Sequence, residues 1–178
     1  MKLLPGMTIP DFPYESLSGR HESFLATLAA RRTALFFHRF AGCRVCQLAM
    51  ADAAAQYPAL KEKGWDAVFV VQSTPENAQA VAQRLGLPFD VICDPEMELY
   101  RRFEVDPAPS QAERGDPAAL EQALRRAEAL GLQKGPAEGN PLQLPAVFVL
   151  GPKGEVLFSA YPKSFQELPS LEELARLA

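Results

Sequence analysis

With 178 residues, the chain is long enough for one domain with a substantial core, and a hydrophobic content of 48% is typical of a globular protein. The net charge of −4 argues against a basic surface that would bind nucleic acid or an anionic membrane. No run of about 18 apolar residues predicts a membrane span, and the start lacks the apolar core of a secretory signal. We therefore expect a cytoplasmic protein.

Apolar patterning predicts strands and helices that alternate along most of the chain. A turn-rich opening covers residues 5–13. Predicted strands cover residues 33–40, 66–72, 89–93, 145–150 and 155–161, and the last two form a hairpin. Predicted helices cover residues 22–30, 43–63, 75–85, 95–103, 117–127 and 171–177. This order predicts an α/β fold, in which a central sheet has helices on both faces.

Capping residues mark several helix ends. A capping residue followed by proline occurs at Thr74, Asp94 and Asp116, which places each proline at the first helical position. Gly86 marks the end of the helix that starts after Thr74. Ser170, followed three residues later by a glutamate, predicts a capping box for the last helix.

Two of the three cysteines, Cys43 and Cys46, lie between the first long strand and the long helix. A helix N-terminus favours negative charge, so we expect the Cys43 thiol to ionise more readily than a free thiol. Cys46 lies about one turn further along the same helix face. Arg39 and Arg44 can stabilise a thiolate at Cys43. We therefore predict that Cys43 is a redox nucleophile and that Cys46 is its resolving cysteine.

Other roles for these side chains stay open at this stage. Cys43 could be a structural thiol, and Cys46 could be a small core residue. Cys93 ends a predicted strand, and we assign it a structural role. His38 could assist proton transfer, but a histidine in such a strand is more often packed. Three cysteines and two histidines at these spacings do not form a zinc ligand set, and we predict neither a metal nor another cofactor.

Three motifs resemble the peroxiredoxin-like branch of the thioredoxin fold, the alkyl hydroperoxide reductase and thiol-specific antioxidant superfamily. The segment Gly6–Phe12 is similar to its G-x-x-x-P-D-F opening, Cys43 follows a strand as its active cysteine does, and Pro145 opens a later strand. Residues 39–46 and 142–145 are similar to the peroxiredoxin-like 2 group in particular. They contain an arginine before G-C-x-x-C and a Leu-Gln-Leu-Pro phrase.

The resemblance implies one thioredoxin-like domain over residues 1–178, with a central mixed sheet and a helical insertion at about 106–143. It implies that Pro145 is a cis-proline that faces the active cysteine. It also implies a peroxide or disulfide substrate and a reducing thiol or thioredoxin-type donor, and it allows a homodimer. The loop over residues 131–144 is then either a lid beside the site or a mobile insertion.

The sequence departs from the peroxiredoxin pattern at Phe40 and Phe36, where typical members have a hydroxyl residue and a proline. A peroxidase needs donors that hold the peroxide, so the missing hydroxyl favours thiol–disulfide exchange, whereas the resemblance favours peroxide reduction. A non-enzymatic redox sensor or interaction module is the alternative to both. We expect a thiol-dependent oxidoreductase that uses the Cys43–Cys46 pair.

Overall fold

The computed structural model describes residues 1–177, which form one mixed sheet of seven strands. The strands are β1 (Tyr14–Ser16), β2 (Gly19–His21), β3 (Arg32–Phe37), β4 (Trp65–Val71), β5 (Asp90–Cys93), β6 (Ala146–Leu150) and β7 (Val156–Ala160). They lie in the order β2-β1-β5-β4-β3-β6-β7 across the sheet. Strand β3 pairs in parallel with β4 and antiparallel with β6, which confirms the predicted mixed sheet.

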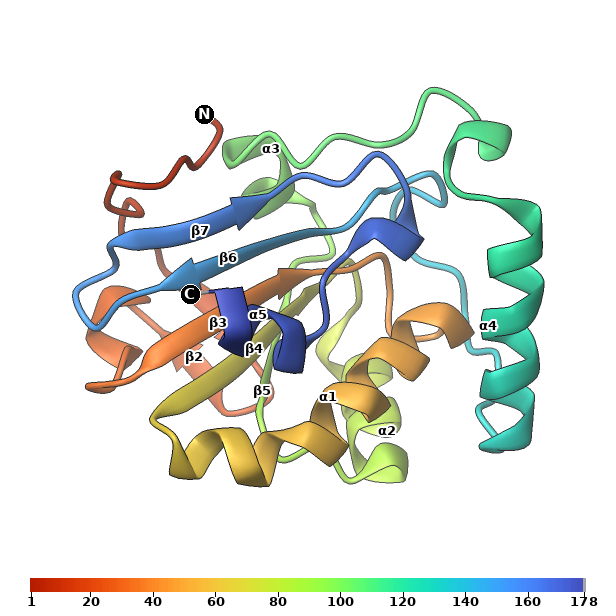
Figure 1. Cartoon of the computed structure of the whole chain (residues 1–178), viewed down its shortest axis with the longest axis horizontal. Helices are drawn as coiled ribbons and strands as arrows, with labels where there is room; N and C mark the ends of the chain where they lie inside the picture. The colour runs from red at the N-terminus through yellow and green to blue at the C-terminus, as the bar shows by residue number, and fades with distance from the viewer. Residues whose placement is uncertain (178) are drawn as a thin grey trace.

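The described residues form five α-helices, which are α1 (Arg44–Glu62), α2 (Pro75–Leu85), α3 (Glu98–Arg102), α4 (Pro117–Ala129) and α5 (Leu171–Leu177). Helices α1, α2 and α5 cover one face of the sheet, and α3 covers the other together with the N-terminal segment (Figure 1). Helix α4 belongs to the segment between β5 and β6 and packs beside α1 (Figure 1). Within residues 1–177, no helix combines the length and apolar character needed to cross a bilayer.

The buried strands divide the core into two layers by simple alternation. In β3, Ala34 and Phe36 pack in the layer under α1, whereas Leu35 and Phe37 pack in the layer under α3. Successive side chains of a strand point to opposite faces of the sheet, and both faces are covered here. This explains why β3 reads as a continuous apolar run rather than as an alternating one. Phe36 stacks on Phe69 of β4, with 4.7 Å between the ring centroids.

Most predicted caps are confirmed. The Thr74 side chain accepts a hydrogen bond from the Asn77 N–H at 3.4 Å, and the Asp116 carboxylate accepts one from the Ala119 N–H at 3.0 Å. Gly86 ends α2 in the left-handed conformation, with φ of 61°. The Thr74 and Asp116 side chains satisfy N–H groups that the first helical turn leaves unpaired, and the Gly86 N–H does so for carbonyls of the last turn of α2.

Two local predictions were wrong, and one hairpin was not predicted. The Asp94 carboxylate accepts hydrogen bonds from the N–H groups of Glu98 and Leu99, so α3 begins at Glu98 rather than at residue 95. The predicted helix over residues 22–30 is only a single turn of 3-10 helix at Leu25–Thr27, because its apolar residues anchor a loop: Phe24 stacks on the ring of Phe12. The hairpin of β1 and β2 was not predicted, because strands of three residues are too short to show alternation.

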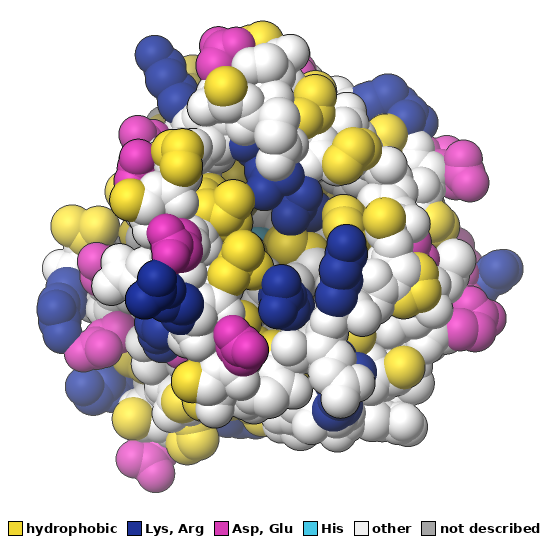
Figure 2. All heavy atoms as spheres, turned by 90° about the vertical axis from the view of Figure 1, so that its right-hand side faces the viewer, with side chains coloured by type: hydrophobic (Ala, Val, Ile, Leu, Met, Phe, Trp, Pro, Cys, Tyr) yellow, Lys and Arg dark blue, Asp and Glu magenta, His cyan; other side chains and the backbone are white. Residues whose placement is uncertain are grey.

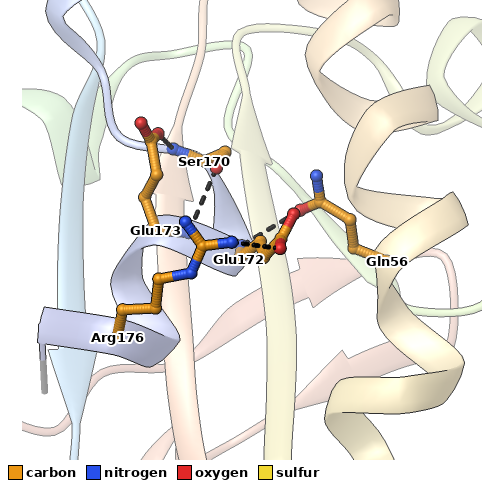
Figure 3. Close-up of polar contacts among 5 residues, drawn as sticks. All are labelled: Gln56, Ser170, Glu172, Glu173 and Arg176. Carbon is orange, nitrogen blue, oxygen red and sulfur yellow. Dashed lines mark hydrogen bonds and ion pairs between the residues drawn. The ribbon is translucent and has the colours of Figure 1, made fainter.

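Helix α5 is attached to α1 through its first turn, as Figure 3 shows. The predicted capping box is present: the Glu173 N–H donates to the Ser170 hydroxyl at 3.2 Å, and the Ser170 N–H donates to the Glu173 carboxylate at 2.7 Å. The Glu172 N–H donates to the Gln56 side chain of α1 at 3.0 Å. These contacts place the start of α5 over α1, where Leu171 forms part of the cavity described below.

Candidate active site

Cys43 is the N-cap residue of α1 and stands at the end of a tightly held turn that follows β3. The Arg39 carbonyl accepts a hydrogen bond from the Gln72 N–H at 2.7 Å, and the Ala41 N–H donates to the Ser73 hydroxyl at 2.8 Å. The Cys43 sulfur itself caps the helix, because it accepts a hydrogen bond from the Cys46 N–H at 3.4 Å. The predicted strand-to-helix junction is therefore formed, with the sulfur at the helix N-terminus.

Arg39 is the charged partner of this sulfur. Its Nη2 donates to Cys43 Sγ at 2.9 Å, and its Nη1 donates to the Pro141 carbonyl oxygen at 2.8 Å. The guanidinium also lies over the ring of Phe40, with 5.2 Å from its central carbon to the ring centroid. A guanidinium held at both ends keeps a positive charge in contact with the sulfur.

The two cysteine thiols have opposite acidities. The hydrogen bond from the Cys46 thiol, with the nearby Arg39 charge, lowers the pKa of Cys43 to about 5, although burial acts in the opposite direction. The pKa of Cys46 is raised well above its usual value, because its proton is held by Cys43 and its site is buried. Cys43 is therefore the thiolate at neutral pH, and Cys46 is the thiol that donates to it.

A cavity of about 260 Å³ opens beside the two cysteines. Its lining includes Cys43, Cys46, Arg39, His38 and Pro145, together with apolar side chains from α1, α4 and α5. Figure 2 looks onto this side of the molecule, which is hollowed and has hydrophobic and basic side chains around the hollow. Cys43 lines this cavity and is 5% exposed, so its sulfur is nearly buried at the cavity wall.

Two predicted site residues differ from expectation. Arg44 is the first residue of α1, and it does not line the cavity or donate a hydrogen bond to Cys43. Pro145 lines the cavity, but the prediction of a cis bond is wrong, since residues 1–177 contain no cis peptide bond. The trans form is the one that most bonds before proline adopt, because it is lower in free energy by about 0.5–1 kcal/mol.

His38 and Cys93 are both buried, with different surroundings. His38 stacks on Phe69 with 5.3 Å between ring centroids, and its Nε2 has no hydrogen-bond partner. Burial, with the charge of Arg39, lowers the pKa of His38 to about 4, so the ring is neutral at the cavity wall. Burial raises the pKa of Cys93 to about 12, and Cys93 lies outside the cavity lining. Within residues 1–177, His, Cys, Asp and Glu form no group of three that could hold a metal.

Sequence reasoning missed Arg114, a buried residue of the segment between β5 and β6 that lines the same cavity. Its Nη1 donates to the Pro141 carbonyl at 3.0 Å, the same oxygen that holds Arg39. No local motif marks this arginine, since it lies outside the helices and strands and reaches the site only through the path of the segment between β5 and β6. A search for arginines in that segment could have found it, but nothing in the sequence distinguishes it from the others.

The loop over residues 131–144, which we call the strap, lies directly beside the C-x-x-C turn. The Gly135 N–H donates to the Gly42 carbonyl at 2.9 Å, and the Gln47 side chain donates to the Gln133 carbonyl at 2.9 Å. At its far end, the Asn140 N–H donates to the Gln72 side chain at 2.6 Å. The strap is thus attached to the active-site turn at Gly42, to α1 at Gln47, and to the segment after β4 at Gln72.

A methyl group at Gly42 should loosen the strap. A Cβ atom there would stand 2.6 Å from the Gly135 carbonyl carbon and 2.6 Å from the Pro136 oxygen, so backbone must shift. We expect Gly42→Ala to lower the free energy of unfolding by about 1–3 kcal/mol and to speed proteolytic cleavage within the strap. Chemical denaturation and limited proteolysis measure the two effects. The matched control is Gly64→Ala: Gly64 has a φ of 82°, so alanine there also lowers stability through backbone strain, but its Cβ meets nothing within 4 Å and unchanged cleavage of the strap is expected.

Comparison with known proteins places the chain in a family. The family model described as AhpC/TSA family matches residues 5–159. The chain belongs to the AhpC/TSA family. It is therefore a thiol-dependent oxidoreductase with a thioredoxin-like, peroxiredoxin-like fold, as the sequence motifs predict.

Individual relatives agree with this assignment. Peroxiredoxin-like 2C of Mus musculus is 25% identical over 158 residues, which are 84% of this chain and 70% of that protein. Thiol-disulfide oxidoreductase ResA of Geobacillus kaustophilus is 28% identical over 106 residues, which are 59% of this chain and 60% of ResA.

Two solved structures share the fold. The yeast mitochondrial 1-Cys peroxiredoxin has a TM-score of 0.70 at 15% identity, covering 98% of this chain and 74% of that one. Enterococcus faecalis AhpC has a TM-score of 0.66 at 18% identity, covering 99% and 90%.

Proposed function

We propose that this AhpC/TSA chain is a thiol peroxidase for small peroxides, in which Cys43 is the nucleophile and Cys46 resolves the oxidised Cys43. The observation that carries the proposal is the environment of the Cys43 sulfur. It accepts hydrogen bonds from Arg39 at 2.9 Å and from the Cys46 N–H at 3.4 Å, at the wall of a cavity. These donors stabilise the thiolate, which is the form that attacks.

The first step is attack of the Cys43 thiolate on one peroxide oxygen. A sulfur–oxygen bond forms, the oxygen–oxygen bond breaks, and Cys43 becomes a sulfenic acid while the other oxygen leaves as an alkoxide or hydroxide. Arg39 stabilises the negative charge as it moves from sulfur to the leaving oxygen. The Cys46 thiol supplies the proton that completes the alcohol or water, because its raised pKa keeps that proton in place until charge develops nearby.

The second step joins the two cysteines. The Cys46 thiolate left by the first step attacks Cys43 sulfur, and the hydroxyl of the sulfenic acid leaves as water after taking a proton from solvent. A disulfide between Cys43 and Cys46 results, so one peroxide has taken two electrons from the pair. An external thiol must then return these electrons, and a small thiol or a thioredoxin-type protein can do so.

The burial of Cys43 supports a small substrate rather than a protein disulfide. The residue is 5% exposed, and the strap lies against the turn through the Gly135–Gly42 hydrogen bond. A peroxide that fits a cavity of about 260 Å³ can reach the sulfur, whereas a folded protein needs the strap to move. Exchange with a small disulfide is the second candidate, and it is favoured by Phe40, which supplies no hydroxyl to hold a peroxide.

A paired assay on the purified protein tests the proposal. Hydrogen peroxide consumption with a thiol donor is measured beside reduction of insulin and of a small aromatic disulfide. We expect peroxide turnover that depends on Cys43, and no reduction of insulin. Turnover of the small disulfide without any peroxide rate would establish the second candidate, and rapid insulin reduction would contradict both. A protein that binds partners but turns over nothing would be the non-enzymatic module.

Two further parts of the proposal are a cytoplasmic location and assembly as a homodimer. The three cysteines are all free thiols, which suits a reducing compartment such as the cytoplasm. Neither this compartment nor a homodimer is needed for the chemistry above, and fractionation and light scattering would test them separately.

A further inference from the structure

The cavity beside Cys43 is more basic than the chain as a whole, whose net charge is −4. The charged side chains in its described lining, apart from the thiols, are Arg39, Arg114, Arg126 and Asp52. Arg126 pairs with Asp52 at 2.9 Å, so these two charges offset each other. Arg39 and Arg114 form no ion pair with a carboxylate among residues 1–177. Two positive charges are therefore left beside the cysteine pair.

Arg114 is held in a fixed, buried position at the cavity wall. The residue is 8% exposed, and its Nη1 donates to the Gln111 side chain at 3.3 Å as well as to the Pro141 carbonyl at 3.0 Å. Because Arg39 donates to the same Pro141 oxygen, one carbonyl holds the two guanidiniums side by side. Burial and then the charge of Arg39 lower the pKa of Arg114, whereas negative charge at Cys43 raises it.

The charge that faces these arginines depends on the redox state of the pair. In the reduced protein, the Cys43 thiolate accepts a hydrogen bond from Arg39 and offsets one of the two positive charges. In the disulfide, neither sulfur carries a charge, and both guanidiniums lose that compensation. A buried positive charge without a counter-ion is unfavourable, so the oxidised cavity attracts an anion more strongly than the reduced cavity does.

The geometry points to a small anionic thiol, with a carboxylate close to its sulfur, as the reductant of the Cys43–Cys46 disulfide, and to Arg114 as the residue that selects it. This inference rests on the proposed function, since it needs that disulfide. The cavity of about 260 Å³ admits a molecule of this size, and its unpaired guanidiniums bind a carboxylate.

The reaction consumes two small thiols for each disulfide. The first thiolate attacks Cys46 sulfur and forms a mixed disulfide, while Cys43 leaves as a thiolate, since the more acidic thiol is the better leaving group. A second small thiolate attacks the sulfur of the bound small thiol, which releases a small symmetrical disulfide and the Cys46 thiolate. Cys46 then takes a proton from solvent. The pair gains two electrons and the two small thiols lose them.

Three small thiols of nearly equal size test the inference: mercaptoacetate, mercaptoethanol and cysteamine carry negative, zero and positive charge. The protein is oxidised with one equivalent of peroxide, and mass spectrometry first establishes whether the Cys43–Cys46 disulfide forms. Its reduction by each thiol is then followed, with each rate divided by the thiolate concentration. We expect mercaptoacetate to react about tenfold faster than mercaptoethanol at low salt, with cysteamine slowest and the differences shrinking as salt is added.

Variants at Arg114 separate selection from a general effect. Arg114→Gln should reduce the advantage of mercaptoacetate by about threefold or more, because only the Arg39 charge is left, and Arg114→Lys should keep the full order because it keeps the charge. Arg125→Gln is the matched control, because Arg125 is an exposed residue of α4 that pairs with Glu121 and does not line the cavity. If the disulfide forms but the three thiols react equally with the wild type, the inference is overturned while the proposed function stands. If no disulfide forms, the proposed function fails first.

Discussion

Replacing Cys43 by serine is expected to abolish peroxide turnover, with a loss of about a thousandfold or more in the second-order rate constant. In the wild type, the Cys43 sulfur accepts a hydrogen bond from the Cys46 N–H at 3.4 Å. The serine hydroxyl has a similar shape and can accept the same hydrogen bond, so the start of α1 should stay folded. Its hydroxyl does not ionise at neutral pH and cannot form a sulfenic acid. Stopped-flow measurement of peroxide loss gives the rate, and circular dichroism shows whether the fold is kept.

The companion variant Cys46→Ser should behave differently. Cys43 can still be oxidised once, so we expect one equivalent of peroxide to be consumed and a sulfenic acid to accumulate, detectable by its adduct with dimedone. Cys93→Ser is the control, since Cys93 lies outside the cavity and burial raises its pKa to about 12. Accumulation of the same dimedone-reactive sulfenic acid in the wild type would show that Cys46 is not the resolving cysteine, and loss of turnover in Cys93→Ser would contradict the structural role of Cys93.

Replacing Arg39 by methionine is expected to raise the pKa of Cys43 and to slow its oxidation at neutral pH about tenfold to a hundredfold. The guanidinium donates to the sulfur at 2.9 Å, and Cys43 is only 5% exposed, so little water can replace this donor. Methionine keeps most of the length of the side chain. The strap should stay attached, because Arg114 still donates to the Pro141 carbonyl at 3.0 Å.

The pH dependence of alkylation by iodoacetamide measures this change directly. In the wild type the pKa of Cys43 is lowered to about 5, so the thiolate is present above that pH and the alkylation rate falls as the pH drops through it. In Arg39→Met the midpoint should move to higher pH, which leaves less thiolate at neutral pH. Arg44→Met is the matched control, since Arg44 precedes Cys46 on the same helix turn but does not line the cavity. A larger shift from Arg44→Met than from Arg39→Met would contradict the assignment.

The sequence by itself determined the parts of the structure that depend on neighbouring residues. The capping side chains of Thr74, Asp116 and Ser170 define helix starts that the structure confirms, because a cap needs only residues two or three positions away. The position of Cys43 at the start of α1 also follows from the residues next to it. Periodicity failed over residues 22–30, because apolar residues at helical spacing there anchor a loop instead of a helix face.

Only the tertiary structure decided which charges face the sulfur. Arg44 is adjacent to Cys43 in sequence and Arg39 is four residues away, yet it is Arg39 that donates to the sulfur, because its guanidinium is held between the sulfur and the Pro141 carbonyl, 102 positions further along the chain. Arg114 reaches the same oxygen through the folding of the segment between β5 and β6, where no motif marks it. A capping residue acts over one helical turn. A buried charge, in contrast, needs partners from segments that are distant in the sequence, and no local pattern predicts those long-range contacts.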